Sequence, residues 1–115
     1  MSSILNTYNR KKINFTKGKG SFLYSKNGKE FKVFGPDDND GLSLLKPFLK
    51  IHFVTQDKKG FAISKKRIVT DMKYPLNLVK TLDRVEWMKN KTSLNKIIYM
   101  GDSIFDHLIF SKVGY

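Results

Sequence analysis

The stretch from Lys96 to Phe110, KIIYMGDSIFDHLIF, places the strongest constraint on the fold of this chain. Its apolar residues Ile97–Met100 run without a polar interruption and stop at Gly101, which is typical of a parallel strand covered on both faces. Asp102 follows, and Ser103 is a candidate N-cap for a helix with an apolar face. The stretch therefore predicts a strand, a tight turn and a helix.

Two carboxylates of this stretch fall where an α/β sheet usually carries its site. Ligands of open α/β sheets bind just beyond the carboxyl ends of the strands, and Asp102 and Asp106 follow such an end. Four residues apart, they can face one crevice. The alternative is that Asp102 only caps the helix and that Asp106 is solvated, and the motif alone leaves both readings open.

Length and composition limit the class of protein. A chain of 115 residues with 40% hydrophobic residues is expected to form one small domain with a modest core. There is no cysteine, which excludes disulfides and thiolate metal sites. No apolar run approaches the length of a membrane span, so we expect a soluble, cytoplasmic protein with no membrane partner.

The charge balance is strongly basic, with 22 Lys and Arg against 10 Asp and Glu, a formal net charge of +12. Such a field attracts nucleic acid, anionic lipid or phosphorylated small molecules without choosing among them. The cations form short clusters interleaved with apolar residues, as solvated faces do, and no nucleic-acid-binding motif accompanies them. Nucleic-acid binding stays open but is not favoured.

The N-terminal third contains the clearest local signal. Residues 1–12 are polar and expected to be loose, and the domain is expected to span residues 13–115, with Ile13–Thr16 as a weak first strand. Residues 21–34, SFLYSKNGKEFKVF, are two β-rich runs around Asn27-Gly28, the dipeptide most typical of a tight β-hairpin.

Strands alternate with helices in the rest of the chain, which predicts an α/β fold with a three-layer, Rossmann-like parallel sheet. The predicted strands are Lys50–Thr55, Leu76–Val79 and Ile97–Met100, and the predicted helices begin near Asp38 or Asp40, Ser64, Asp83 and Ser103. Two histidines, His52 on a strand and His107 on a helix, are more typical of packing or solvated positions than of catalysis.

These features together resemble a known family. The hairpin, the Gly35-Pro36-Asp37-Asp38 break, Thr55 and the GDSIFD motif are similar to the haloacid dehalogenase (HAD)-like phosphatases, over residues 20–115. The likeness is to the branch that contains 3-deoxy-octulosonate 8-phosphate phosphatase and its relatives from acylneuraminate clusters. It implies that the hairpin is a flap, that the chain forms a homo-oligomer, a tetramer in those relatives, and that a phosphosugar or another anion binds.

The resemblance also implies roles for individual residues. Thr55 matches the hydroxyl residue that binds a phosphoryl oxygen, and Arg84 stands where the family has a charge-balancing lysine. An arginine can pair with phosphate, but its planar guanidinium does not copy an ammonium. Asp102 and Asp106 match the motif that holds Mg²⁺.

The family's nucleophile and acid/base aspartates are missing. Ungapped spacing places Lys12 and Asn14 at those positions, and no Asp or Glu precedes Glu30. Because the nucleophile also helps to hold the metal, magnesium binding is expected to be weak or lost, and the Lys12 ammonium is expected to pair with Asp102 or Asp106 in its place.

The chain also ends at Tyr115, where relatives continue, which indicates a domain truncated at its C-terminus. We therefore expect a phosphatase-family domain without activity. One alternative is an active magnesium-dependent phosphatase that uses another nucleophile or a complementing chain. A second alternative is a basic nucleic-acid-binding module.

Overall fold

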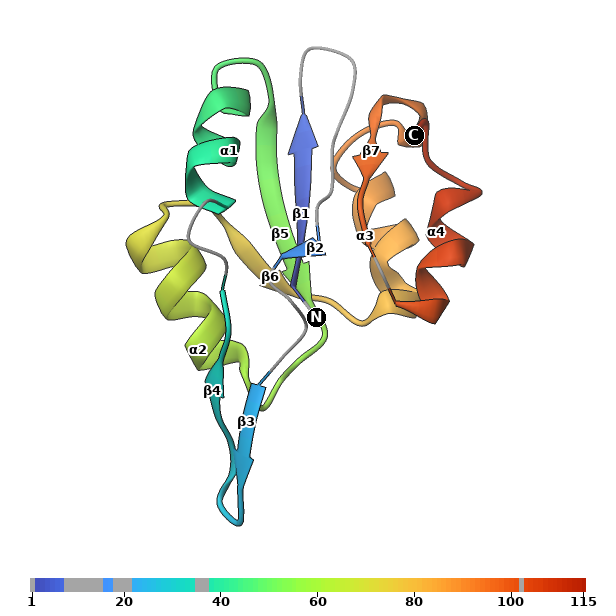
Figure 1. Ribbon diagram of the computed structural model, residues 1–115. Coiled ribbons are helices and arrows are strands. Elements are labelled where there is room, and N and C mark those ends of the chain that lie inside the picture. The colour runs from blue at the N-terminus through green and yellow to red at the C-terminus, as the bar shows by residue number, and fades with distance from the viewer. Residues whose placement is uncertain (1, 8–15, 18–21, 35–37, 102) are drawn as a thin grey trace.

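In the computed structural model, a small sheet lies between two groups of helices, α1 and α2 on one side and α3 and α4 on the other (Figure 1). The structure describes residues 2–7, 16–17, 22–34, 38–101 and 103–115. The strands of this sheet are β1 (Ser2–Thr7), β2 (Thr16–Lys17), β5 (Lys50–Thr55), β6 (Leu76–Leu78) and β7 (Ile98–Tyr99). The α-helices are α1 (Asp38–Leu45), α2 (Phe61–Lys65), α3 (Arg84–Lys89) and α4 (His107–Phe110). The α/β class is as predicted.

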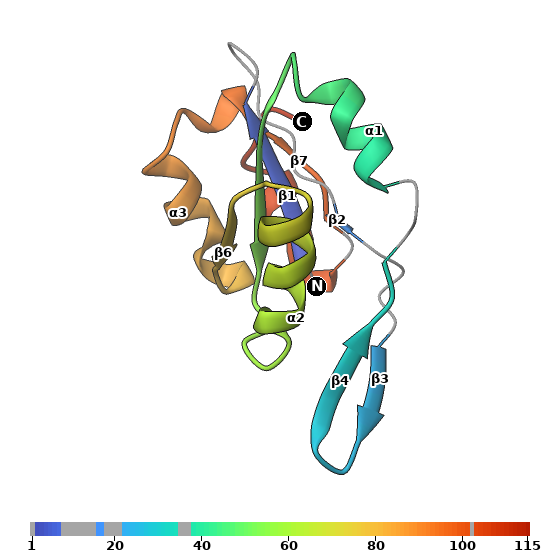
Figure 2. The ribbon, with the colours of Figure 1, turned by 90° about the vertical axis from the view of Figure 1, so that its left-hand side faces the viewer.

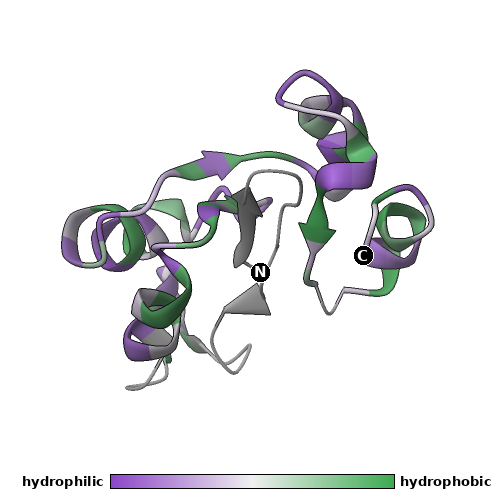
Figure 3. Cartoon of the chain, turned by 90° about the horizontal axis from the view of Figure 1, so that it is seen from above, coloured by the Kyte–Doolittle hydropathy of each residue, from purple (hydrophilic) through white to green (hydrophobic). Residues whose placement is uncertain are grey.

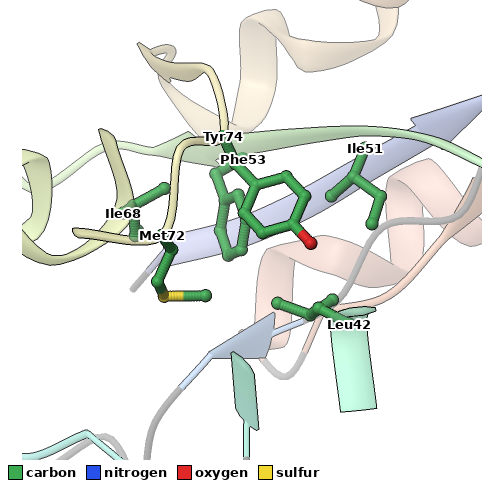
Figure 4. Close-up of a cluster of buried hydrophobic side chains, with 6 residues drawn as sticks. All are labelled: Leu42, Ile51, Phe53, Ile68, Met72 and Tyr74. Carbon is green, nitrogen blue, oxygen red and sulfur yellow. The ribbon is translucent and has the colours of Figure 1, made fainter. Parts of the chain in front are cut away.

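One hydrophobic cluster fills the space between β5, the helix α1 and the π-helical segment η1 (Lys66–Asp71) that continues α2. Alternate residues of β5, Ile51 and Phe53, point to this side, as strand geometry requires. The cluster shown in Figure 4 consists of Leu42, Ile51, Phe53, Ile68, Met72 and Tyr74. Seen from above, the helices carry both hydrophobic and hydrophilic residues (Figure 3).

A second cluster lies around β7, where Ile97 and Tyr99 pack against Met88 of α3 and Ile109 of α4. His52, on the strand face opposite Phe53, packs edge-on against the Trp87 ring at a centroid distance of 6.4 Å. The predicted packing role of His52 is confirmed. The two clusters account for the helices on both sides of the sheet.

The central strand is not the one that the sequence predicted. Ser2–Thr7, expected to be loose, forms β1 between β5 and β7 and runs antiparallel to both. All six residues of β1 pair with β5, from Ser2 opposite Thr55 to Thr7 opposite Lys50. Backbone N–H and C=O groups of neighbouring strands can form hydrogen bonds in a parallel or an antiparallel arrangement. The antiparallel β1 can therefore take the central position.

The fully parallel sheet predicted from the strand and helix alternation is therefore wrong at this strand. β5 and β6 do pair in parallel, and β7 runs in the same direction as β5 because both oppose β1. The predicted strand Ile13–Thr16 lies largely outside the described residues, and Thr16 belongs to β2, which pairs with the start of β1.

A β-hairpin lies where the Asn-Gly pair predicts one. Its strands are β3 (Phe22–Ser25) and β4 (Gly28–Lys32), and the turn at Lys26–Asn27 is its tip. Figures 1 and 2 show that it projects beyond the end of the sheet. The exposed side chains include a directly opposed apolar pair, Leu23 and Phe31. Self-association through this face stays a prediction.

The helix starts are confirmed in part. Ser103 caps the turn η4 (Ile104–Asp106) before α4, with Asp106 completing a capping box. Ser64 was predicted to cap a helix, and this prediction is wrong, because Ser64 lies buried inside α2. Helix α2 begins at Phe61 and continues as the π-helical segment η1 (Lys66–Asp71). Within the described residues, no helix is long and apolar enough to cross a membrane.

Candidate functional site

Thr55 ends β5 at the sheet edge where the site was expected. Its side chain is buried, and its Oγ1 accepts a hydrogen bond from the backbone N–H of Asp57 at 3.1 Å. Within the described residues, the Thr55 hydroxyl accepts this bond and donates none. A threonine hydroxyl can also donate one hydrogen bond, and the Thr55 side chain is fully buried in this structure.

Backbone bonds connect Thr55 to Arg84, the second predicted phosphate ligand. The N–H of Val79 donates to the Thr55 carbonyl at 2.7 Å, and the Val79 carbonyl accepts from Arg84 Nε at 3.3 Å. Gln56 adds a parallel link, because its Oε1 accepts from both the N–H and the hydroxyl of Thr81, in the turn η2 (Thr81–Asp83) that leads into α3. Thr55 and Arg84, the two predicted phosphate-binding residues, are therefore connected by hydrogen bonds through Val79.

Arg84 is the centre of a buried polar network. Its Nη1 donates to the Tyr99 hydroxyl at 2.7 Å, and that hydroxyl donates to Asp106 Oδ1 at 2.6 Å. Arg84 Nη1 also lies 3.6 Å from the same carboxylate oxygen, with both side chains no more than 3% exposed. The Asp106 carboxylate is thus the buried counter-charge of Arg84. The family resemblance had predicted that the Arg84 charge balances a phosphate.

The other Asp106 oxygen, Oδ2, accepts from the backbone N–H of Ser103 at 2.8 Å. Burial raises the pKa of Tyr99; the nearby Arg84 charge opposes this shift, and the hydrogen bond to Asp106 adds to it. The phenol therefore stays protonated and bridges the two charged groups.

Gly101 is the reason that the carboxylate fits against the end of β7. A Cβ at this position would overlap Asp106 Oδ2 and lie 2.6 Å from Asp106 Cγ and 2.9 Å from Tyr99 Cε1. Every other residue type would collide with the network, so glycine is required at this turn.

The described donor set does not fit a magnesium ion. Both oxygens of Asp106 already accept hydrogen bonds, and a guanidinium lies beside one of them, whereas Mg²⁺ needs free oxygen ligands in octahedral geometry. No group of three or more His, Asp or Glu side chains in the described part of the chain could hold a metal. Asp102 lies outside the described residues, and the metal roles stay predictions.

A second polar cluster, here called the clasp, joins the hairpin to the loop after β5. Lys29 and Lys32 of β4 both reach Asp57 Oδ2, at 2.6 and 2.9 Å. Asp57 Oδ1 accepts from the backbone N–H of Gly60 at 3.0 Å, and Lys32 Nζ also donates to Ser64 Oγ at 2.7 Å. The clasp therefore holds two lysine ammonium groups of the hairpin against Asp57, which follows Thr55 by two residues in the sequence.

The clasp holds its carboxylate ionised. Partial burial acts to raise the pKa of Asp57, but the hydrogen bonds from Lys29, Lys32 and the Gly60 N–H outweigh it and hold the pKa well below its usual range. The three partially buried groups form an ion cluster that water screens less than a surface pair.

The remaining predicted site residues have mixed outcomes. Lys12, Asn14 and Asp102 lie outside the described residues. The hypothesis of a Lys12 pair with Asp102 or Asp106 relied on a strand near residues 13–16 between β5 and β7, and β1 takes that place instead. His107 is exposed, and its Nδ1 lies 2.5 Å from the Ile104 carbonyl oxygen, consistent with the non-catalytic reading.

The roles of Tyr99 and of the clasp are not predicted by the sequence patterns. Tyr99 stands in an apolar run typical of a buried strand, although a buried tyrosine hydroxyl generally finds a polar partner. Lys29 and Lys32 are three residues apart, which in a regular strand places them on opposite faces. Asp57, two residues beyond the end of a predicted strand, was the available signal.

Comparison with known proteins supports the fold. No protein-family model and no curated protein matches this sequence. Among solved structures, the chain is similar to a putative HAD family hydrolase from Streptomyces avermitilis MA-4680, with a TM-score of 0.64 and 18% sequence identity. The match covers 88% of this chain and 59% of that one, so the chain spans less than two thirds of the neighbour's length. The likeness shows a HAD-like α/β fold.

Proposed function

We propose that this chain is a HAD-phosphatase-like domain that binds phosphate or another anion at the carboxyl end of β5 and does not turn over phosphomonoesters. The HAD-like fold and the position of Thr55 at the end of β5 support the anion site. A phosphosugar is the ligand class that the sequence resemblance implies.

The direction of β1 carries the proposal that activity is lost. Covalent phosphoryl transfer of the family's kind needs a carboxylate at the carboxyl end of the strand between β5 and β7. The carboxyl end of β1, Thr7, pairs with Lys50 at the opposite edge of the sheet from Thr55. No acidic residue occurs in β1 or anywhere before Glu30, so this strand brings no nucleophile to the site.

Arg84 has a structural role in this proposal. Its guanidinium is buried and neutralised by Asp106. The anion is therefore attracted by the Thr55 hydroxyl and by the positive net charge of the chain, and not by Arg84. The formal charge of +12 favours any anionic ligand through its long-range field.

A combined assay tests both parts. The purified protein is incubated with magnesium and a panel of phosphomonoesters, including p-nitrophenyl phosphate, and inorganic phosphate is titrated in by calorimetry. We expect no hydrolysis above the buffer rate and measurable phosphate binding that Thr55→Val weakens at least fivefold. Thr70→Val, on an exposed helix position, is the matched control and should bind phosphate like the unaltered chain.

Two results would contradict the proposal. Magnesium-dependent turnover that disappears in Asp102→Asn would establish an active phosphatase with another nucleophile. Phosphate binding that is absent, or equal in the Thr55 and Thr70 variants, would remove the anion site.

A further inference from the structure

The clasp depends on an irregularity in the hairpin. Leu23 pairs with Phe31 and the next residue, Tyr24, pairs with Lys29, so Glu30 has no partner on β3 and forms a bulge. Because of the extra residue, the side chains of Lys29 and Lys32 lie on the same face of the strand instead of opposite faces. Both ammonium groups therefore reach the same oxygen of Asp57. The opposite face of the ribbon carries the exposed Leu23 and Phe31 pair.

Asp57 touches both parts of the proposed site. Its side chain contacts the hairpin lysines, and its backbone N–H donates to the hydroxyl of Thr55. Gly60 makes the close approach of the loop possible, because a Cβ there would overlap the Asp57 carboxylate and lie 2.6 Å from Lys32 Cε. One residue thus connects the hairpin to the end of β5.

We infer that Asp57 is a positioning residue that fastens the hairpin beside Thr55 and sets the orientation of the Thr55 hydroxyl toward an incoming anion. The inference rests on the proposed function only for the role of Thr55. A two-stranded ribbon is marginally stable by itself in water, so its docking on the domain through Lys29 and Lys32 keeps it ordered. Removing the Asp57 charge releases the ribbon while the core clusters around Phe53 and Met88 remain intact.

Hydrogen exchange of the ligand-free protein tests the fastening. In Asp57→Asn, which keeps the size of the side chain and its acceptor for Gly60, we expect the amides of residues 22–32 to exchange at least tenfold faster. The amides of β5 should change by less than twofold. Asp71→Asn is the matched control, because Asp71 forms an exposed ion pair with Lys66 at 3.0 Å that does not involve the hairpin.

A mutant cycle shows whether the lysine and the carboxylate act together. Lys32→Met and Asp57→Asn should each accelerate exchange of the hairpin, and the double variant should be little faster than either single variant. Additive effects, hairpin exchange within twofold of the unaltered chain, or equal acceleration in β5 would overturn the fastening role.

Phosphate titration tests the connection to Thr55. Removing a negative charge beside an anion site would strengthen phosphate binding if Asp57 acted only through its charge. A positioning role predicts the opposite, a weakening of at least threefold in Asp57→Asn, with recovery in Asp57→Glu. Tighter binding in Asp57→Asn would overturn the positioning role, whereas absence of phosphate binding in the unaltered chain would refute the proposed function and leave the exchange result to decide the fastening.

Discussion

The Tyr99 hydroxyl lies between the guanidinium of Arg84 and the carboxylate of Asp106, and it bonds to Arg84 Nη1 at 2.7 Å and to Asp106 Oδ1 at 2.6 Å. All three side chains are buried. A buried ion pair is favourable only when its remaining donors and acceptors are satisfied, and here the phenol, the Ser103 N–H and the Val79 carbonyl do this. Arg84 and Asp106, to which the family resemblance assigns phosphate and metal binding, are thus joined to each other through Tyr99.

The first prediction concerns the buried charge of this network. Asp106→Ala leaves Arg84 without its counter-charge and is expected to lower the free energy of unfolding by about 3–5 kcal/mol. The control is Glu86→Ala, which removes an exposed pair with Lys89 and should cost less than about 1 kcal/mol. Urea denaturation measures both, and equal losses would show that Asp106 and Arg84 form no significant buried pair.

The second prediction isolates the phenol. Tyr99→Phe preserves the ring that packs edge-on against Phe110 at 5.6 Å but leaves Arg84 and Asp106 each short of one hydrogen bond. We expect a loss of about 1–3 kcal/mol of unfolding free energy. A loss near zero would mean that the two charged groups move together and close the 3.6 Å gap between them.

Local signals predicted those parts of the fold that depend on local chemistry. The β-rich segment of β5, the Asn-Gly hairpin and the Ser103 cap each follow from neighbouring residues. The direction of β1 does not, because Ser2–Thr7 has no alternation of polar and apolar residues and its pairing depends on β5 and β7, which lie far from it in the sequence.

The candidate site was predictable in position and not in its contacts. Thr55 is the last residue of β5, and Asp106 lies in the turn η4 that follows β7, two strands that the sequence identified. Their partners depend on geometry that spacing does not reveal: a bulge at Glu30 that aligns two lysines, and a glycine turn that brings Asp106 back against Tyr99.

The third prediction tests that turn. Gly101→Ala places a methyl group into the Asp106 carboxylate and the Tyr99 ring, and we expect a loss of about 1–3 kcal/mol. Gly41→Ala is the matched control: Gly41 lies in α1 with nothing within 4 Å of an added Cβ, so it should stabilise the protein by about 0.5–1 kcal/mol. Thermal unfolding with opposite shifts for the two variants is the expected result, and a stable Gly101→Ala protein would contradict the close packing.

The last prediction concerns pH. The clasp holds the pKa of Asp57 below its ordinary value of 3.8, so on acidification the unfolded chain takes up this proton before the folded protein does. The stability due to Asp57 is then complete above about pH 5 and decreases as the pH falls through 4 and below. We expect the difference in unfolding free energy between the unaltered chain and Asp57→Asn to be constant from pH 5 to 7 and to shrink from pH 4 to 2. Asp71→Asn, whose pair with Lys66 is exposed, should show a much smaller difference throughout. A difference that grows on acidification would mean that Asp57 binds its proton more readily in the folded protein, and that the lysines do not stabilise its charge.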